Sequence, residues 1–256
     1  MVHHGALLVR SEMTKKNMRT PHKLKSRGPV AKNCVVLFVK STLSGQVKTR
    51  FSQLIGEKIT RGLYKAFVSD IMETLQQDPL YSLRIAFFPQ KARSSVVRWL
   101  GTQNTYFPQK GTGLGERMEN AFTQVFSEGF EKALIIGSDI PNLPRSIITN
   151  ALESLSTRDA VIGPSFDGGY YLIGFRHDTF SPSVFKRIEW GTDTVLFQTL
   201  KRFDKTQIVQ IMPLWQDIDN LYDIKELLER SAHTPFENSR TISFIKRSRK
   251  IRHFFR

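Results

Sequence analysis

The sequence contains a single cysteine among 256 residues, so the chain cannot form an internal disulfide. This absence excludes small domains that depend on disulfide bonds, and it makes a reducing cytoplasm the simplest location. The sequence also lacks any apolar run near the ~20 residues that a membrane-spanning helix needs. Its first residues lack the basic region and the long apolar core of a signal peptide. We therefore expect a cytoplasmic protein without a transmembrane segment.

Acidic residues are scarce at both ends of the chain. The net charge is +15, of which residues 1–33 contribute +7 and residues 240–256 another +7, so the residues between them carry only +1. Charge runs of this kind are usually solvated and mobile, although they could contact RNA or an anionic membrane. Apart from Phe254 and Phe255, they lack the interleaved aromatic residues of a nucleic-acid stacking platform. We expect basic tails, with nucleic-acid binding, if any, only through them.

Between these ends, short apolar runs alternate with helical patterns. Strands are predicted at residues 33–40, 82–89 and 132–137, because these runs are apolar nearly throughout. Apolar residues recur at helical spacing over 51–75, where Gly56 and Gly62 leave open whether one helix or two form. Strands that alternate with helices indicate a Rossmann-like α/β fold, with a mostly parallel sheet and helices on both faces. We predict one domain over residues 33–232, flanked by basic tails at 1–32 and 233–256.

The loop KSTLSGQVKTR follows the first predicted strand and precedes a helix. Gly45 would let the backbone approach a ligand closely, and Lys40, Lys48 and Arg50 supply positive charge. Such a loop suits phosphate groups, because the N–H groups at a helix start also favour anions. The spacing is neither that of a Walker A loop nor that of G-x-G-x-x-G. Basic loop residues are also often no more than solvated surface.

The loop QKGTGLGERM has three glycines within five positions, which is costly unless positive φ or a close approach is needed. Gly113, Gly115 and Arg117 are therefore candidates for binding a nucleotide. The alternative is that Gly115 and Glu116 merely begin the following helix, where an acidic residue is favourable.

Three further loops carry acidic residues. Asp139 in GSDIP follows an apolar strand, where it can cap the next helix or bind a divalent cation. Asp167 in SFDGGYY precedes two glycines, a pattern that also favours a tight hairpin. Asp217 and Asp219 alternate in QDIDN, so an extended chain places both on one face. Asp219 or Asn220 could cap the next helix, or one of the two acids could join Asp139 on a metal.

Six motifs occur in a fixed order: FVKSTLSGQVKTRF, GTGLGERMENAF, IIGSDIPNLP, GPSFDGGYYLIGF, RIEWGTDTV and DIDNLYDI. Together they resemble the bacterial glycosyltransferase-like family of GT-A fold that includes the arsenosugar-biosynthesis-type glycosyltransferases. That family is related to the guanylyltransferases that make the molybdenum cofactor and phospholactate-derived coenzymes. The resemblance covers about residues 34–229 and implies a GT-A domain, but a fold does not fix the reaction.

The resemblance also implies roles for the matching residues. Asp139 and Asp219 would hold Mg²⁺ or Mn²⁺, with Asp139 essential for catalysis, and Asp167 would orient the acceptor or act as a base. The nucleotide-binding candidates are Lys40, Gly45, Lys48, Arg50, Gly113, Gly115 and Arg117. The substrate-binding candidates are Asp167, Gly168, Gly169, Tyr170, Trp190 and Thr192.

The sequence departs from the family pattern at three positions, one of which is Asn220, where Thr is commoner. Ser138 precedes Asp139 where many glycosyltransferases have Asp-x-Asp, which moves the pattern toward the nucleotidyltransferases. Thr42 replaces the proline of a K-x-P-x-x-G pattern, and the loss of proline makes the first loop less preorganised.

The leading hypothesis is a metal-dependent glycosyltransferase-like enzyme that uses a nucleotide-linked sugar donor and a small-molecule acceptor. The first alternative is a nucleotidyltransferase that releases pyrophosphate from a nucleoside triphosphate. The second is a non-catalytic protein that binds RNA or a membrane through its basic tails. The sequence leaves the donor, the acceptor and the oligomeric state open.

Overall fold

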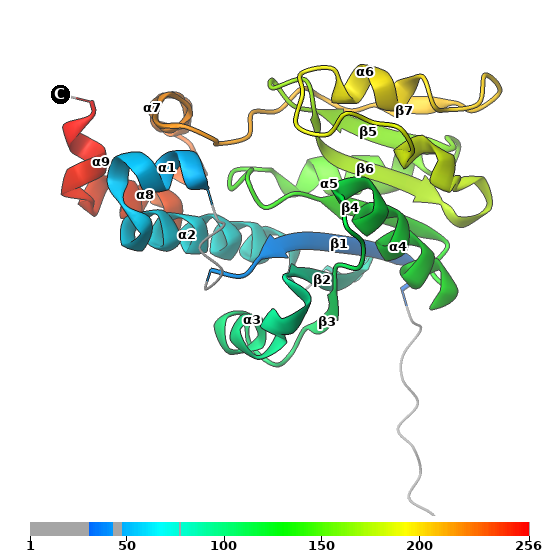
Figure 1. Ribbon diagram of the computed structural model, residues 1–256, viewed down its shortest axis with the longest axis horizontal. Helices are drawn as coiled ribbons and strands as arrows, with labels where there is room; N and C mark the ends of the chain where they lie inside the picture. Colours follow the sequence, from blue (N-terminus) through cyan, green and yellow to red (C-terminus); the bar gives the residue numbers. More distant parts are fainter. Residues whose placement is uncertain (1–30, 43–47, 77, 256) are drawn as a thin grey trace, which may run out of the picture. The chain divides into compact units, whose positions relative to one another are not determined.

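A central β-sheet organises the structure, a computed structural model that describes residues 31–42, 48–76 and 78–255. Within these residues, seven strands hydrogen-bond in the order β3-β2-β1-β4-β6-β5-β7 (Figure 1). The strands are β1 (Asn33–Lys40), β2 (Ser82–Phe88), β3 (Thr105–Pro108), β4 (Lys132–Ile136), β5 (Ala160–Pro164), β6 (Tyr170–Arg176) and β7 (Val209–Ile211). Strand β6 runs antiparallel to β4 and β5, and the other neighbouring pairs are parallel. The prediction of a mostly parallel sheet is confirmed.

Helices connect most of the strands. The α-helices are α1 (Thr49–Ile55), α2 (Glu57–Leu75), α3 (Arg93–Leu100), α4 (Leu114–Ser127), α5 (Arg145–Ser154), α6 (Val195–Leu200), α7 (Leu221–Ser231), α8 (Arg240–Arg247) and α9 (Arg249–His253). Short 3₁₀ turns are η1 (Gln90–Ala92), η2 (His177–Thr179), η3 (Pro182–Phe185) and η4 (Pro235–Asn238). Among the described residues, we find no helix that combines the length and the apolar character needed to cross a membrane.

Both faces of the sheet are covered, as the alternating apolar pattern predicts (Figure 1). On one face, α2, α3 and α5 pack on alternate strand residues such as Leu37 and Leu134. On the other face, α4 and η3 pack on the intervening residues, such as Val36 and Ile135, with α6 at the edge of the cluster. Because successive strand residues point to opposite faces, near-continuous apolar strands supply both layers.

A third apolar cluster lies beyond the sheet and includes the C-terminal helices. Phe67 of α2 and Leu227 of α7 pack there with Ile242 and Ile245 of α8 and Ile251 of α9, and all five are almost completely buried. The segment 233–256, predicted as a basic tail outside the domain, therefore differs from that prediction over most of its length. Its isoleucines recur at helical spacing, and burying them outweighs the local excess of charge.

Two glycines shape the contact between the N- and C-terminal helices. Gly56 has φ of 84° and separates α1 from α2, so the predicted helical region over 51–75 forms two helices. Gly62 stays inside α2, and a Cβ atom there would lie only 2.6 Å from the ring of Phe244 in α8. The missing side chain therefore lets α8 approach α2 closely.

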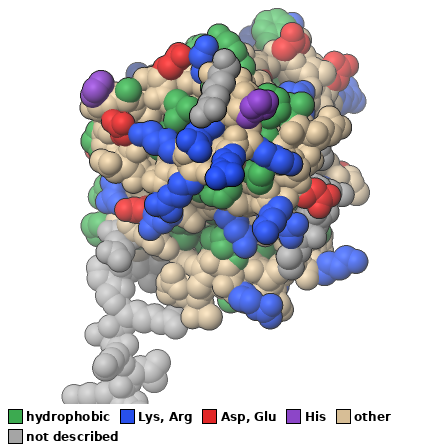
Figure 2. All heavy atoms as spheres, turned by 90° about the vertical axis from the view of Figure 1, so that its left-hand side faces the viewer, with side chains coloured by type: hydrophobic (Ala, Val, Ile, Leu, Met, Phe, Trp, Pro, Cys, Tyr) green, Lys and Arg blue, Asp and Glu red, His purple; other side chains and the backbone are tan. Residues whose placement is uncertain are grey.

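The basic residues of the C-terminal segment remain on the surface. Figure 2 shows Lys and Arg side chains gathered on the side of the molecule that carries α1, α8 and α9 in Figure 1. The exposed bases of the last two helices and their junction are Lys246, Arg247, Arg249, Lys250 and Arg252. Amphipathic helices thus reconcile the basic composition of this segment with its buried apolar face.

The predicted N-terminal tail, residues 1–32, lies outside the described residues except for Ala31 and Lys32, and so does Gly45 in the first loop. The residues Ala31–Arg256 form one unit. Within it, the loops that follow β4, β5 and β7 meet at the edge of the sheet that the carboxyl ends of these parallel strands form. The N–H of Ile218 donates to the carbonyl of Asp139 at 2.9 Å, and Ser165 forms a bridge with Trp215.

We predict that Ile245→Ala lowers the free energy of unfolding by about 2–4 kcal/mol, because the variant leaves a void in the third apolar cluster. Urea unfolding of the full chain measures this loss. The matched control is Arg247→Ala on the exposed face of the same helix, which should change stability by no more than about 0.5 kcal/mol. Equal effects of the two variants would show that α8 does not contribute to the core.

Candidate functional site

A cavity of about 340 Å³ opens where the loops at this edge of the sheet converge. We call it the site cavity. Most residues that the sequence singled out line it, together with several that it did not. The polar lining includes Lys40, Gln109, Arg117, Ser138, Asp139, Ser165, Asp167, Tyr170, Tyr171, Trp190, Thr192, Asp217 and Asp219. The crevice outside the carboxyl ends of parallel strands is the usual place for a ligand in an open α/β sheet.

The ammonium group of Lys48 joins two of the acidic loops. Its Nζ lies 3.0 Å from Oδ1 of Asp139 and also pairs with Oδ1 of Asp219. It donates a further hydrogen bond to the carbonyl of Ile218 at 2.6 Å. Only 7% of the Lys48 side chain is exposed, against 40% for Asp139 and 37% for Asp219. Asp139 and Asp219 were predicted to share a divalent metal ion. In the structure, both pair with the ammonium group of Lys48.

The charges of this network depend on one another. Burial on its own would lower the pKa of Lys48, but the carboxylates of Asp139 and Asp219 raise it above its ordinary value. Burial on its own would likewise raise the pKa of Asp219, but the ammonium group of Lys48 holds it below its ordinary range. Lys48 and Asp219 are therefore both charged at neutral pH.

Three carboxylates gather beside this network. One oxygen from each of Asp167, Asp217 and Asp219 lies within 4.8 Å of the others. Burial, together with the negative charges of Asp167 and Asp219, raises the pKa of Asp217 to about 7. Hard divalent cations such as Mg²⁺ and Mn²⁺ prefer carboxylate oxygens. The donor set and its unbalanced negative charge therefore fit such a cation.

The turn between β5 and β6 fixes Asp167. Its Oδ1 accepts hydrogen bonds from Oγ of Ser165 at 2.5 Å and from the N–H of Gly169 at 2.9 Å. Gly168 has φ of 83°, and a Cβ atom there would lie 1.9 Å from the carbonyl oxygen of Asp193. Glycine is therefore required at position 168 by the backbone, whereas Gly169 lines the site cavity.

Tyr64 of α2 holds the ends of two neighbouring strands together. Its hydroxyl accepts a hydrogen bond from the N–H of Lys40 at 2.9 Å and lies 2.8 Å from Oγ of Ser138. This buried contact sets the spacing between the last residue of β1 and the residue that precedes Asp139. The exposed side chain of Lys40 also contributes to the cavity lining.

Arg117 provides a fixed cation at another side of the cavity. Its guanidinium carbon lies 3.8 Å from the ring centroid of Phe88, and its Nε and Nη2 donate to the carbonyls of Gly111 and Thr112, both at 3.2 Å. Desolvation lowers the pKa of Arg117 below its ordinary value, yet arginine stays charged in proteins. Its planar group can face an anion or a planar ring.

The glycines that open α4 have different surroundings. A Cβ atom at Gly115 would lie 2.8 Å from the carbonyl oxygen of Phe185 and 2.9 Å from the indole of Trp190. At Gly113 a Cβ atom would meet nothing within 4 Å. Neither glycine is part of the cavity lining, and neither is the exposed Arg50. Gly115 instead allows Trp190 to pack on α4 and reach the cavity.

The predicted substrate residues Tyr170, Trp190 and Thr192 do line the cavity. Tyr170 and Trp190 make an edge-to-face contact with ring centroids 6.3 Å apart. The hydroxyl of Thr192 donates to the carbonyl of Glu189 at 2.8 Å. These contacts hold one aromatic wall of the cavity in place.

The sequence analysis did not assign several residues of the site, among them Asp217 and Gln109. Asp217 was weighed as a metal ligand, but only Asp219 was assigned, although the alternation of the two acids pointed to both. Gln109 is buried, and its Nε2 donates to the carbonyls of Ala86 at 2.8 Å and Val39 at 3.4 Å. No spacing signal in the sequence identified Gln109.

The chain is similar to several known proteins. A family model described as "Uncharacterized protein conserved in bacteria (DUF2064)" matches residues 71–192. A crystal structure from Desulfovibrio desulfuricans G20, provisionally named a nucleotide-diphospho-sugar transferase, is 35% identical, has a TM-score of 0.84, and covers 88% of this chain and 99% of that chain. A search of curated proteins found no match.

Two more distant structures share the fold. A cytidylyltransferase from Leptospira borgpetersenii is 13% identical, with a TM-score of 0.51 and coverage of 86% of this chain and 96% of that chain. A 4-diphosphocytidyl-2C-methyl-D-erythritol synthase from Anaerococcus prevotii is 10% identical, with a TM-score of 0.50 and coverage of 78% and 97%. The predicted α/β fold of the nucleotide-diphospho-sugar transferases is thus confirmed.

We predict that Lys48→Met lowers the free energy of unfolding at pH 7 in the presence of a chelator. Removal of one partner of a fully buried pair costs ~3–5 kcal/mol, and we expect on the order of 2 kcal/mol here because both carboxylates are more than one-third exposed. Urea unfolding measures the loss, and Lys40→Met, at an exposed lysine that lines the site cavity, is the control.

The pH dependence of this loss follows from the direction of the pKa shifts. A lowered pKa for Asp219 and a raised pKa for Lys48 mean that the pair stabilises the fold between about pH 4 and pH 10. The stabilisation disappears as pH falls through the pKa of folded Asp219. The difference between the wild-type protein and Lys48→Met should therefore shrink at pH 3, and a pH-independent difference would contradict the assignment.

Proposed function

Since this chain belongs to the GT-A-like family that includes the Desulfovibrio desulfuricans protein and that the DUF2064 model describes, we propose that it is a metal-dependent transferase that uses a nucleotide-linked sugar donor. The observation that carries the proposal is the convergence of four carboxylates on one cavity at the ligand-binding edge of this fold, two of which also pair with Lys48. An acidic cluster beside cationic side chains suits a diphosphate that arrives with a divalent cation.

In this proposal, Asp217 and Asp219 hold Mg²⁺ or Mn²⁺, because their oxygens belong to the closely spaced set and two carboxylates with substrate phosphates suffice for such an ion. When bound, the ion would offset negative charge on the diphosphate. The sequence analysis assigned the ion to Asp139 and Asp219 instead. Asp219 is common to both assignments, and Asp139, held by Lys48, stands next to it.

The cations of the site cavity suit the nucleotide. Lys40 lies at the end of β1 and Arg117 on α4, and both line the cavity that the acids line. We assign the phosphates to the region between Lys40 and the acids. Arg117 and Gln109 then remain for the base or the ribose, as a planar cation and an amide that also line the cavity.

The proposed reaction replaces one bond at the sugar. The oxygen of an acceptor hydroxyl forms a bond to the anomeric carbon, and the bond from that carbon to the diphosphate oxygen breaks. The nucleoside diphosphate leaves with the electron pair. The proton of the hydroxyl passes to a carboxylate, and we assign this role to Asp167, which is exposed and fixed by Ser165 and Gly169.

A nucleotidyltransferase reaction is the second candidate, favoured by the single acid of the Ser138-Asp139 motif. In that reaction, an acceptor oxygen attacks the α-phosphorus of a nucleoside triphosphate, and pyrophosphate leaves. The same cations and acids would serve both reactions.

We also propose a cytoplasmic location. Cys34 lies buried in β1, and burial raises the pKa of its thiol to about 12, so the thiol stays protonated and unreactive at neutral pH. A single inert thiol gives the chain no need for an oxidising compartment. Recovery of the native protein only from the extracellular medium would contradict this location.

We predict that nucleotide sugars with Mn²⁺ or Mg²⁺ raise the melting temperature of the full chain, and that a chelator abolishes the increase. A thermal-shift panel of nucleotide sugars and nucleoside triphosphates tests this. Analysis of the products then separates the two candidates, since glycosyl transfer releases a nucleoside diphosphate and nucleotidyl transfer releases pyrophosphate. Stabilisation by neither class of nucleotide would refute both.

We predict that Asp217→Asn and Asp219→Asn each reduce turnover by on the order of 100-fold or more and weaken Mn²⁺ binding measured by calorimetry. Asp139→Asn should weaken Mn²⁺ binding less than Asp217→Asn does. The control Glu153→Gln removes one negative charge from an exposed position of α5 and should leave both quantities unchanged. If Asp139→Asn instead abolishes Mn²⁺ binding while Asp217→Asn retains it, the ligand set predicted from the sequence is the right one.

A further inference from the structure

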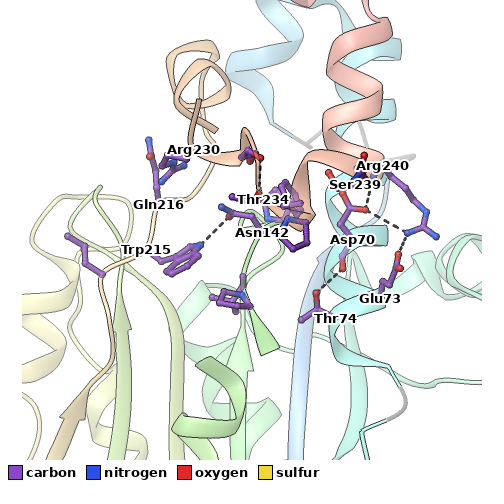
Figure 3. A pocket seen from close by; sticks show the side chains of 18 of the residues that line it. Asp70, Glu73, Thr74, Asn142, Trp215, Gln216, Arg230, Thr234, Ser239 and Arg240 are labelled. Atoms are coloured by element: carbon purple, nitrogen blue, oxygen red, sulfur yellow. Dashed lines mark hydrogen bonds and ion pairs between the residues drawn. The ribbon is translucent and has the colours of Figure 1, made fainter. Parts of the chain in front are cut away.

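A second and larger cavity, of about 1180 Å³, lies on the other side of the loops that carry the acids. It is bordered by α2, the loop 141–144, Phe166, the segment 214–216, the end of α7 and the start of α8. Figure 3 shows Trp215, Gln216 and Arg230 along one side and Asp70, Glu73 and Arg240 along the other. We call it the second cavity.

Each of the three acidic segments faces both cavities. In the first, Asp139 lines the site cavity and Asn142 lines the second cavity. In the β5–β6 turn, Asp167 lines the former and Phe166 the latter. The remaining acids, Asp217 and Asp219, are preceded by residues 214–216 of the second cavity. A single layer of loops therefore separates the second cavity from the carboxylates.

The wall formed by these loops is apolar. Phe166 is 65% exposed and Leu214 is 50% exposed, although both are large apolar side chains. Trp215 also lines this cavity, and its indole N–H donates to Oδ1 of Asn142 at 3.1 Å (Figure 3). Exposed apolar groups concentrated in a cavity, with fixed polar neighbours, are typical of a binding site.

The charged groups on the opposite wall satisfy one another. The carboxylate of Asp70 accepts hydrogen bonds from the N–H groups of Arg240 at 3.0 Å and Thr241 at 2.8 Å. The guanidinium of Arg240 pairs with Glu73 and lies 3.7 Å from Asp70. These contacts fix the start of α8, and the two carboxylates share the one guanidinium group.

Arg230 differs from these residues. It is exposed in the last turn of α7, and its Nε donates only a long hydrogen bond, of 3.4 Å, to the carbonyl of Glu226. Among the charged residues that line the second cavity, all within the described part of the chain, Arg230 alone forms no ion pair. A guanidinium in this state can pair with a carboxylate or phosphate of a ligand.

We propose that the second cavity binds the acceptor of the transfer reaction, and that this acceptor has an apolar body and one anionic group. The apolar body packs on Phe166, Leu214 and Trp215, and the anionic group, a phosphate or a carboxylate, pairs with Arg230. The inference rests on the proposed transferase function, because it requires the acceptor hydroxyl to extend past Phe166, which lines the second cavity, to the adjacent Asp167, which lines the site cavity. The bases of the nearby C-terminal helices also favour the approach of an anion.

Calorimetry with hexyl phosphate as the probe tests this inference on the full chain saturated with a nucleotide sugar and Mn²⁺. Hexanol lacks the charge and inorganic phosphate lacks the apolar body, so the two serve as matched probes. Hexyl phosphate should bind with one site per chain and at least tenfold more tightly than either. Hexyl hydrogen succinate, which carries a carboxylate in place of the phosphate, shows which anion is preferred.

Two variants locate the binding. Arg230→Gln should weaken hexyl phosphate binding about tenfold and bring it close to that of hexanol. Leu214→Ser should weaken hexyl phosphate and hexanol alike, and its exposed position keeps the fold intact. The control Lys225→Gln removes one positive charge from an exposed position of the same helix and should have no effect.

The outcomes separate this inference from the proposed function. Two results would overturn the second-cavity assignment alone, provided that the chain binds the nucleotide. One is that hexyl phosphate does not bind, and the other is that neither variant changes its affinity. Absence of nucleotide binding would overturn the proposed function, whatever hexyl phosphate does. If Arg230→Gln and Lys225→Gln weaken hexyl phosphate binding equally, the overall positive charge of the surface explains the effect and Arg230 has no specific role. That result would also overturn the assignment.

Discussion

The ion pairs of Lys48 are the interaction on which the candidate site depends. One ammonium group joins Asp139 after β4, Asp219 before α7 and the carbonyl of Ile218, so segments about 80 to 170 residues apart meet at a point. Without this cation, the carboxylates at this edge would repel one another at close range. Burial and the negative charges of Asp167 and Asp219 nevertheless raise the pKa of Asp217, against the opposing effect of Lys48. The site is thus an acidic cluster that is only partly neutralised by the protein itself.

Helices α2 and α8 hold the strands that carry this acidic cluster in position. Tyr64 ties the ends of β1 and β4 together, and α2, which carries Tyr64, is itself covered by α8. The C-terminal helices therefore belong to the framework that positions the acids. Their basic outer face and their apolar inner face serve different purposes, because the former meets solvent and the latter completes the core.

The sequence predicted the sheet and the hairpin at Asp167, and most of the site residues that it singled out line the cavity, since these depend on local patterns: continuous apolar strands, turn glycines and acids at strand ends. It did not predict that Lys48 would bind carboxylates, because that contact spans 171 residues between Lys48 and Asp219. The high net charge of residues 240–256 led to the prediction of a basic tail, although the spacing of Ile242 and Ile245 is typical of a helix with one apolar face. Gly115 was expected at a nucleotide, whereas it makes room for Trp190.

The thin wall between the two cavities has a consequence for how this family could diversify. Along each acidic loop, one residue faces the carboxylate side and its neighbour faces the apolar side. Mutations at positions such as 166 and 214 can alter the apolar surface of the second cavity while the carboxylates that line the site cavity stay unchanged. Substitutions at these few positions would therefore change which molecules fit the second cavity without removing any carboxylate of the site cavity.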